Sequence, residues 1–281
     1  MAFIEFHDVS YATGGVSILS DINFTIEKGD FVAVLGANGS GKSTLAKLMN
    51  GLLLPSSGEV TVMGLNTKNA ETGKEIRKKI GIVFQNPDNQ IVAAMVEDDV
   101  AFGPENLNVD SEEIERRIIS SLETVGLLDK RKAPSYTLSG GQKQKVAIAG
   151  ALAMNTVALI LDEATTMLDP ESRKEVFRTI LDLNKKNGIT VIYITHFTEE
   201  ILEADKAIVL DNGKIAAISS PKELFAQNCK LNNLNLKYPF AYRVAEMLRK
   251  RGVNLSVGIY AEERLLQELK GIFSEGYGNR N

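Results

Sequence analysis

The segment Gly36-Ala-Asn-Gly-Ser-Gly-Lys-Ser43 constrains this chain more than any other feature of its sequence. It follows the apolar run Phe31–Leu35, which predicts a buried strand, and it precedes the helix-forming residues Thr44–Leu48. The pattern G-x-x-x-x-G-K-[ST] between a strand and a helix predicts a loop whose backbone N–H groups surround phosphate oxygens. A glycine-rich turn with an exposed lysine is the alternative, and the flanking strand and helix disfavour it.

Each residue type in this loop has a chemical reason to be there. Glycines let the backbone turn tightly enough for several N–H groups to point inward, and the helix that follows adds the positive end of its dipole. Lys42 is placed to reach the β- and γ-phosphates of a nucleotide, and the Ser43 hydroxyl is placed to bind Mg²⁺. The residues expected to contact the nucleotide here are Gly36, Asn38, Gly39, Ser40, Gly41, Lys42, Ser43 and Thr44.

A second buried strand is predicted to bring two carboxylates to the same place. The apolar run Val157–Leu161 ends directly in Asp162 and Glu163. We expect Asp162 to hold Mg²⁺ through water and Glu163 to act as general base for the attacking water. Acidic residues at the end of a strand are common, so this interpretation depends on the phosphate loop elsewhere in the chain.

The hydrophobic pattern predicts an α/β fold with a mostly parallel sheet. Buried-strand runs alternate with segments whose apolar residues recur at helical spacing, an order typical of strands joined by covering helices. The further runs are Gly81–Phe84 and Thr190–Ile194, and the helical stripes are Ile114, Ile118, Leu122 and Val125, and Val176, Ile180 and Leu183. Ile22, Phe24 and Ile26 alternate with polar residues, which indicates an additional antiparallel β subdomain.

Two regions differ from this alternation. Residues 86–156 contain no convincing strand and are interpreted as a helical subdomain inserted into the sheet domain. Residues 229–281 are expected to form a small C-terminal helical extension to a domain that spans residues 1–228, with one helix around Val244, Met247 and Leu248 and a second near Glu262–Lys270.

Composition limits where such a protein works. The 281 residues carry a net charge of −4, which argues against a basic surface for nucleic acid. Cys229 is the single cysteine, and Glu5 and Asp8 stand where a signal peptide has basic residues, so a reducing cytosolic compartment is expected. The uncharged stretch Val146–Leu161 is too short to span a membrane, and attachment to one would need another protein.

A third motif, Leu138-Ser139-Gly140-Gly141-Gln142, precedes a helix predicted over Lys143–Met154. Small residues, free N–H groups and a serine hydroxyl at a helix N-terminus form a potential second anion site. Since one triphosphate already has its own loop in this chain, a second phosphate-recognising element indicates a partner. The alternative is a serine N-cap followed by two glycines.

With these motifs in place, the sequence resembles the ATP-binding-cassette ATPases, for which LSGGQ is the signature. The family's elements occur in order over roughly residues 2–227, and they are Tyr11, GANGSGKS, Gln85, LSGGQ, LILDE, Met167-Leu168-Asp169 and His196. The resemblance implies ATP and Mg²⁺ as cofactors and ATP hydrolysis as the activity. It also implies two ATPase subunits placed head to tail, so that Ser139–Gln142 of one cap the nucleotide of the other.

The resemblance also assigns roles to single residues. It implies that Tyr11 stacks on adenine and that Gln85 contacts magnesium and water while sensing a transmembrane partner. Asp169 is implied to lie at the subunit junction, and His196 to contact the γ-phosphate and orient Glu163. The sequence departs from the family pattern at Lys145, Ala164 and Thr166-Met167, which leaves every phosphate, metal and base position filled.

Within that family the sequence is most similar to the ATPases of energy-coupling-factor importers, specifically the first of their two paired ATPases. The segments that carry this similarity are Phe84–Ile91, Val100–Asn106, Asp162–Pro170 and Tyr238–Gly252. The resemblance implies import of vitamins or transition-metal ions and a peripheral position on the cytoplasmic face of the cell membrane. The implied partners are a second ATPase (paralogue or identical chain), a transmembrane coupling protein and a substrate-binding membrane protein, with no nucleic acid.

Other interpretations remain open at this point. A soluble cassette ATPase of translation generally carries two cassettes, and one of DNA repair has a long coiled coil between the phosphate loop and the carboxylates; neither fits this chain. An exporter ATPase is a further alternative. Ile91, Val92 and Met95 are candidates for a groove that receives membrane helices, although packing into the core is the more ordinary fate of each.

Overall fold

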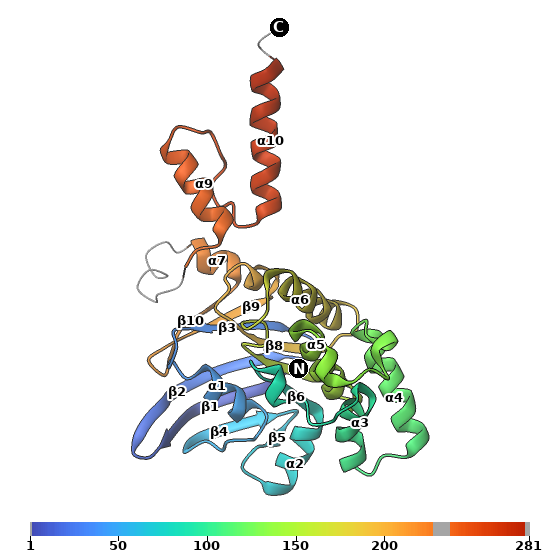
Figure 1. The fold of residues 1–281 in the computed structure, drawn as a ribbon. Helices are drawn as coiled ribbons and strands as arrows, with labels where there is room; N and C mark the ends of the chain where they lie inside the picture. Colours follow the sequence, from blue (N-terminus) through green and yellow to red (C-terminus); the bar gives the residue numbers. More distant parts are fainter. Residues whose placement is uncertain (1, 227–236, 279–281) are drawn as a thin grey trace.

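The chain folds into an antiparallel and a mostly parallel sheet with helices around them (Figure 1). The computed structural model describes residues 2–226 and 237–278. Cys229 and the boundary predicted between residues 228 and 229 lie outside the described residues. The two-sheet architecture confirms the α/β fold with a separate antiparallel layer that the alternating pattern predicted.

The antiparallel sheet is built from the N-terminal part of the chain. Its strands, in the order β2-β1-β4-β5, are β1 (Ala2–Thr13), β2 (Val16–Glu27), β4 (Ser57–Val62) and β5 (Leu65–Asn66). Ile22, Phe24 and Ile26 are all buried while their neighbours along β2 face outward. The period of two seen in the sequence therefore corresponds to a sheet with one covered face.

The six-stranded sheet carries the central part of the fold. In the order β10-β9-β3-β8-β7-β6, its strands are β3 (Phe31–Gly36), β6 (Ile80–Val83), β7 (Ala158–Asp162), β8 (Thr190–Ile194), β9 (Lys206–Asp211) and β10 (Lys214–Ser219). Every pair is parallel except β9 with β10. The carboxyl ends of β3 and β7 therefore reach the same edge, where ligands bind in open parallel sheets.

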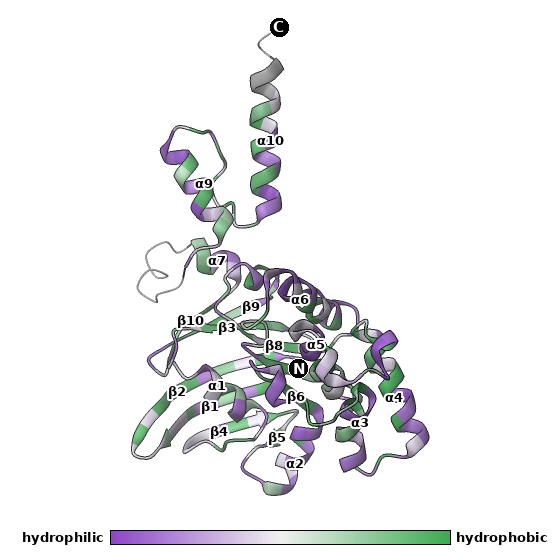
Figure 2. Cartoon of the chain, viewed as in Figure 1, coloured by the Kyte–Doolittle hydropathy of each residue, from purple (hydrophilic) through white to green (hydrophobic). Residues whose placement is uncertain are grey.

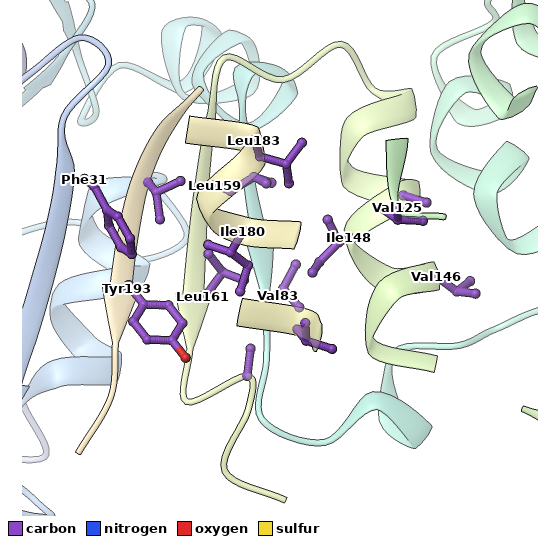
Figure 3. Close-up of a cluster of buried hydrophobic side chains, with 14 of the residues drawn as sticks. Phe31, Val83, Val125, Val146, Ile148, Leu159, Leu161, Ile180, Leu183 and Tyr193 are labelled. Carbon is purple, nitrogen blue, oxygen red and sulfur yellow. The ribbon is translucent and has the colours of Figure 1, made fainter. Parts of the chain in front are cut away.

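Both faces of this sheet are buried, which explains its continuous apolar runs. Along β3, Phe31, Ala33 and Leu35 pack against one hydrophobic cluster, whereas Val32 and Val34 pack against a second that contains the antiparallel sheet. Figure 3 shows part of the first cluster, with Phe31 beside Tyr193. In Figure 2 the central strands are largely hydrophobic, while the outer helices carry mixed surfaces.

Helices surround the sheets. They are α1 (Lys42–Met49), α2 (Ala70–Lys79), α3 (Val96–Asn106), α4 (Ser111–Thr124), α5 (Gly140–Ala153), α6 (Pro170–Lys185) and α7 (Pro221–Ala226), with 3₁₀ turns η1 (Pro87–Asn89), η2 (Leu128–Lys130), η3 (Ser135–Thr137) and η4 (Glu200–Glu203). Among these helices, α2, α4, α5 and α6 begin at a residue whose side chain caps the first turn. Helix α5 begins at Gly140 rather than at Lys143, because Ser139 and Gln142 cap each other's backbone N–H groups. The sequence placed that start too late.

Two further helices follow the residues 227–236. They are α9 (Phe240–Lys250) and α10 (Glu262–Gly278), and α10 continues past the end predicted at Lys270. They share a small core of Ala241, Ala245, Leu255, Ile259 and Leu265, and they project beyond α7 (Figure 1). Among the described residues, no helix is both long enough and apolar enough to cross a membrane.

Candidate functional site

A cavity of about 820 Å³ lies where the carboxyl ends of β3 and β7 meet the start of α1 and the segment after β6. Its walls come from the loop before α1 and the first turns of that helix, from the segment after β6, and from two carboxylates at the end of β7. The lining residues are Ile18, Asn38, Gly39, Gly41, Lys42, Ser43, Thr44, Lys47, Phe84, Gln85, Asn86, Asn89, Gln90, Asp162 and Glu163. Most of the loop and strand-end residues predicted for the site therefore meet in one place.

The loop before α1 depends on glycine at two positions. Gly36 has φ +151°, and a β-carbon there would run into the Leu210 carbonyl and lie 2.5 Å from the Ser40 hydroxyl oxygen. Gly41, at the N-cap of α1, has φ +103°, and a β-carbon there would lie 2.6 Å from the Leu19 side chain. These conformations, which other residues rarely adopt, turn the backbone tightly around the cavity.

Lys42 is the buried cation of the site. Only 5 % of the residue is exposed, and its ammonium donates hydrogen bonds to the carbonyl oxygens of Gly36 at 3.0 Å and Ala37 at 3.1 Å. The same nitrogen lies 3.6 Å from Glu163 Oε1. A buried ammonium in the first turn of α1, where the helix presents its free N–H groups, favours a highly charged anion such as a triphosphate.

Asp162 fits a magnesium site by an observation independent of its motif. It is buried, and its Oδ1 atom has no hydrogen-bond partner, which is costly for an ionised oxygen. Burial raises the pKa of the Asp162 carboxyl, against a hydrogen bond with Ser43 that lowers it. The Ser43 hydroxyl and the Asp162 Oδ1 atom, which has no hydrogen-bond partner, are oxygen ligands of the kind Mg²⁺ prefers, so the residues present fit this ion.

Glu163 is held in the cavity by a strained backbone. Its φ of +53° lies in the left-handed region, which is uncommon for a residue with a β-carbon. The backbone N–H of Glu163 donates to the Ile194 carbonyl at 3.0 Å, and its side chain remains partly exposed beside Lys42. Such conformations cluster at functional sites, where the surrounding structure imposes them.

The segment after β6 forms the wall opposite the phosphate loop. The Gln90 side chain receives a hydrogen bond from Phe84 N at 2.9 Å and donates one to Phe84 O at 3.0 Å. Gln144 of α5 donates to the same Phe84 carbonyl at 3.1 Å, and the Lys143 ammonium lies 2.6 Å from Asp88. The wall that contains Gln85 is thereby tied to the first turns of α5.

The LSGGQ residues lie at the exposed start of α5 and do not line the cavity. The Gln142 N–H donates to Ser139 Oγ at 3.3 Å, and the Ser139 N–H donates to the Gln142 side chain at 3.0 Å. A β-carbon at Gly141 would lie 2.8 Å from Ser172 Cβ, so this helix start packs closely on α6, whereas Gly140 is exposed. The serine is an N-cap, as the alternative interpretation held, and its exposed position leaves it accessible to a second molecule.

Five other predicted residues also lie outside the cavity lining. Tyr11 is half-buried on β1 and packs on the antiparallel sheet, while His196 is exposed with its ring 4.5 Å from that of Phe197. Asp169 caps α6, and its hydrogen bond with Ser172 holds the pKa of this exposed carboxyl below its usual range. Gly36 and Ser40 belong to the phosphate loop, but neither is among the residues that line the cavity, and Ser40 is buried.

Sequence reasoning missed some lining residues. Lys47 lies one turn beyond the motif on α1 and adds positive charge near Asp162. Gln90 was named only as part of the segment Phe84–Ile91. A polar residue so close to Gln85 could have indicated a side chain that hydrogen-bonds to the backbone of the same loop. Among the candidate groove residues, Val92 is 63 % exposed, so packing into the core is wrong for it, and Ile91 and Met95 are half-buried.

Comparison with known proteins shows which family this chain matches. The family model described as "ABC transporter" matches residues 19–166. An energy-coupling factor transporter ATP-binding protein EcfA1 from Caldanaerobacter subterraneus is 50 % identical over 250 residues, which cover 89 % of this chain and 90 % of that protein. A protein of the same name from Symbiobacterium thermophilum is 48 % identical over 256 residues, covering 91 % and 89 % of the two chains.

Solved structures give the same result for the fold. The structure of cbiO1 from Clostridium perfringens, described as part of the ABC transporter complex cbiONQ, superimposes with a TM-score of 0.77 at 36 % identity and covers 88 % of this chain and 99 % of its own. The ATP-binding cassette MJ0796, solved as a dimer in a post-hydrolysis state with ADP and Pi, has a TM-score of 0.68 at 29 % identity, covering 78 % and 98 %.

Proposed function

This chain belongs to the ABC transporter family of ATP-binding subunits, and on that premise we propose that it energises an energy-coupling-factor importer. The family is that of ATP hydrolases that use Mg²⁺, as the resemblance of the motifs predicted. One observation carries the proposal. The cavity that joins Lys42, Ser43, Asp162 and Glu163 lies in a chain that matches such importer subunits along about nine-tenths of its length.

Binding of the nucleotide begins with the loop before α1. Its amides and the Lys42 ammonium neutralise the β- and γ-phosphates, with residues Gly36 to Thr44 as the contacts. Ser43 and Asp162, together with Gln85, would hold Mg²⁺, and that ion, when bound, spreads the negative charge of the terminal phosphate. Tyr11 supplies an aromatic surface for adenine, from a position beside the cavity rather than in its lining.

Hydrolysis requires a base close to the terminal phosphate. Glu163 meets that requirement, because its strained backbone directs the carboxylate to within 3.6 Å of the Lys42 ammonium. A carboxylate in this position accepts a proton from water as the water attacks phosphorus. His196, which follows β8, contacts the γ-phosphate and orients Glu163 once the site closes. The catalytic residues we propose are Glu163, His196 and Gln85.

A closed site requires a second ATPase subunit. Ser139, Gly140, Gly141 and Gln142 lie at the start of α5 and outside the lining of this chain's own cavity, and Ser139 and Gly140 are exposed there. This placement suits contact with nucleotide bound to another chain. Asp169 lies at the junction between the two chains. ATP shifts the pair toward its closed state by binding that state more tightly than the open one. We propose that the partner is a paralogue or an identical chain.

Conformational changes of the ATPase cycle reach the membrane through the cavity wall that contains Gln85. That wall is tied to α5 by Gln144 and Lys143, so it moves with the helices between β6 and β7. We propose that these helices contact a transmembrane coupling protein, with exposed Val92 among the contacts. The chain then lies peripherally on the cytoplasmic face, and a substrate-binding membrane protein selects a vitamin or transition-metal ion.

The proposed domain division follows these roles. Residues 1–228 form the nucleotide-binding domain, with residues 86–156 as its helical subdomain, and residues 229–281 form the C-terminal extension. The separate small core shared by α9 and α10 supports treating the extension as a unit.

Gentle detergent extraction of the full chain from membranes tests the function. We expect small hydrophobic proteins and a second ATPase to copurify, and the complex to hydrolyse ATP in the presence of Mg²⁺. Ribosomes or DNA in place of membrane proteins would contradict the importer. Retention of ATPase activity with a single fused membrane protein would favour an exporter.

A further inference from the structure

Glu200 is a buried carboxylate that the mechanism above does not use. It lies in η4, four residues after His196, and only 8 % of the residue is exposed. Its Oε2 atom accepts hydrogen bonds from the Tyr193 hydroxyl at 2.7 Å and the Thr195 hydroxyl at 3.0 Å. Buried carboxylates are rare unless their charge has such partners, so this one requires an explanation.

The hydrogen bonds around Glu200 run in one direction. Tyr193 has a single hydroxyl proton and gives it to the carboxylate, so its oxygen accepts from Thr165 Oγ1, which lies 2.8 Å away. Thr195 also gives its proton to the carboxylate and accepts from the Phe197 N–H at 3.0 Å. Figure 3 shows the Tyr193 hydroxyl oxygen pointing away from Phe31. Every donor in the network therefore points toward Glu200.

This network joins two segments that carry the proposed catalytic groups. Thr165 lies two residues after Glu163, and Thr195 directly precedes His196. On the other side, Glu200 Oε1 lies 3.8 Å from Arg173 Nε, one turn after the Asp169 cap of α6, and the Arg173 guanidinium stacks 4.0 Å from the Phe197 ring centre. Burial raises the pKa of the Glu200 carboxyl, against these hydrogen bonds and Arg173, which lower it.

We propose that Glu200 is a positioning residue for ATP hydrolysis, which holds the segment of His196 in register with the segment of Glu163 through Thr195, Tyr193 and Thr165. This inference rests on the proposed function, because it concerns the geometry of that reaction. A base and the group that orients it must be held closely, since a displacement of about 1 Å can cost about 10²-fold in rate. Glu200 contacts neither nucleotide nor water in this scheme and acts only through its neighbours.

The variant Glu200→Gln tests the proposal without changing side-chain size. Its amide has one acceptor oxygen instead of two, and its NH₂ group must face either the two hydroxyls or Arg173, which are all donors. In the membrane complex we expect kcat to fall by about 10- to 100-fold, since displacing the segments of His196 and Glu163 lowers the rate less than removing the base does. The KM for ATP and the Kd for ATP are expected to stay within about twofold, because the phosphate loop is untouched.

A second variant acts on the same network from its other end. Thr165→Val keeps the side-chain shape and removes the proton given to Tyr193, so it should also lower kcat and leave the ATP Kd unchanged. If both act through one network, the double variant is no slower than the slower single variant. Glu203→Gln makes the same chemical change on an exposed residue of η4 and is the matched control, expected to behave as the wild type.

The outcomes separate the inference from the function on which it rests. Wild-type kcat in both Glu200→Gln and Thr165→Val overturns the positioning role while leaving the ATPase intact. A fall in ATP affinity equal to the fall in kcat, accompanied by a lower Tm, also overturns it, because that pattern is structural. Should Glu200→Gln fail to fold, Thr165→Val decides alone. A wild-type complex without ATPase activity contradicts the function and the inference together.

Discussion

Glu163 has a backbone conformation that most residues avoid, and the role as base that we propose for it leads to a direct prediction. Glu163→Gln keeps the size of the side chain but cannot accept a proton. We expect this variant to bind ATP as the wild type does and to hydrolyse it about 10²–10⁴-fold more slowly. Equilibrium binding of ATP and single-turnover hydrolysis measure the two properties separately.

The control for this variant is Glu171→Gln, which changes an exposed carboxylate in the first turn of α6. It should retain wild-type turnover. Normal hydrolysis by Glu163→Gln would remove the base assignment, whereas loss of ATP binding would mean that the carboxylate helps to shape the cavity rather than to catalyse the reaction.

Gly36 gives a second prediction for a single residue. In Gly36→Ala the new methyl group meets the Leu210 carbonyl and the Ser40 hydroxyl, so the loop must shift away from its phosphate-binding geometry. We expect ATP affinity to fall by about tenfold or more, which corresponds to a loss of about 1.4 kcal/mol or more in binding. Titration with ATP, alongside a thermal unfolding curve, measures the effect.

Gly126→Ala is the matched control, because Gly126 also has positive φ, at +71°, yet a β-carbon there meets nothing within 4 Å. It carries the backbone strain of a left-handed residue, about 1–2 kcal/mol, without the clash. Equal loss of ATP affinity in both variants would show that strain alone, rather than the shape of the phosphate loop, accounts for the result.

The sequence was sufficient to place residues that belong to short motifs. It was insufficient for residues that come together only because distant strands pair in the sheet. Lys42, Ser43, Asp162 and Glu163 were predicted to come together, and all four line one cavity. Glu200 and its partner Thr165 were not anticipated, because their connection through Tyr193 depends on β7 and β8 lying side by side. Such pairing follows from the topology and leaves no local pattern.

At the scale of elements, the start of α5 has two functions that can be separated experimentally. Ser139→Ala removes the N-cap oxygen and should cost about 1 kcal/mol of helix stability. Ser139→Asp keeps a good N-cap but places a negative charge where we propose a phosphate binds. We therefore expect Ser139→Asp to keep the wild-type Tm and to lose most ATPase activity of the assembled complex.

Ser139→Asn is the control for Ser139→Asp, since asparagine caps helices as well as aspartate does and carries no charge. It should retain more of the activity than the charged variant. Similar activity in the two variants would mean that no anion approaches this helix start, and the LSGGQ segment would then be only a cap.

Element boundaries were predicted best where the local sequence decides them. The strand Thr190–Ile194 was predicted with the bounds it has in β8, because its residues are apolar on both faces. The start of α5 was placed too late, at Lys143 rather than Gly140. The reciprocal capping of Ser139 and Gln142 makes the two glycines of the LSGGQ motif part of the helix.

At the scale of the whole molecule, the active site that we propose is shared between two chains predicts an effect in trans. When a Ser139→Asp chain is paired with an intact second ATPase, the charge faces nucleotide bound by the partner. We expect that hydrolysis at the partner's site falls more than hydrolysis at this chain's own cavity. A photoreactive ATP analogue, followed by separation of the two chains, reports which chain retains labelled nucleotide.

The reverse distribution would refute the sandwich, because loss confined to the mutant's own cavity requires its LSGGQ segment to act in cis. The same complex built with the Ser139→Asn chain is the control, and it should label both chains nearly as the wild type does. The whole-molecule architecture of two sheets was predictable from alternation of strands and helices, whereas the place of α9 and α10 beyond α7 was not.

The ties between the cavity wall and α5 have a mechanical consequence. Gln144 and Lys143 anchor only the first turns of a helix of 14 residues, which is about 21 Å long. Because Val146, Ile148 and Ala153 are buried farther along α5, we propose that this helix tilts together with the helices packed on it, with its pivot at the nucleotide site. A tilt of about 5° at that pivot displaces the far end by about 2 Å. A small movement around a phosphate would therefore become a displacement large enough to shift a protein in contact with the opposite end.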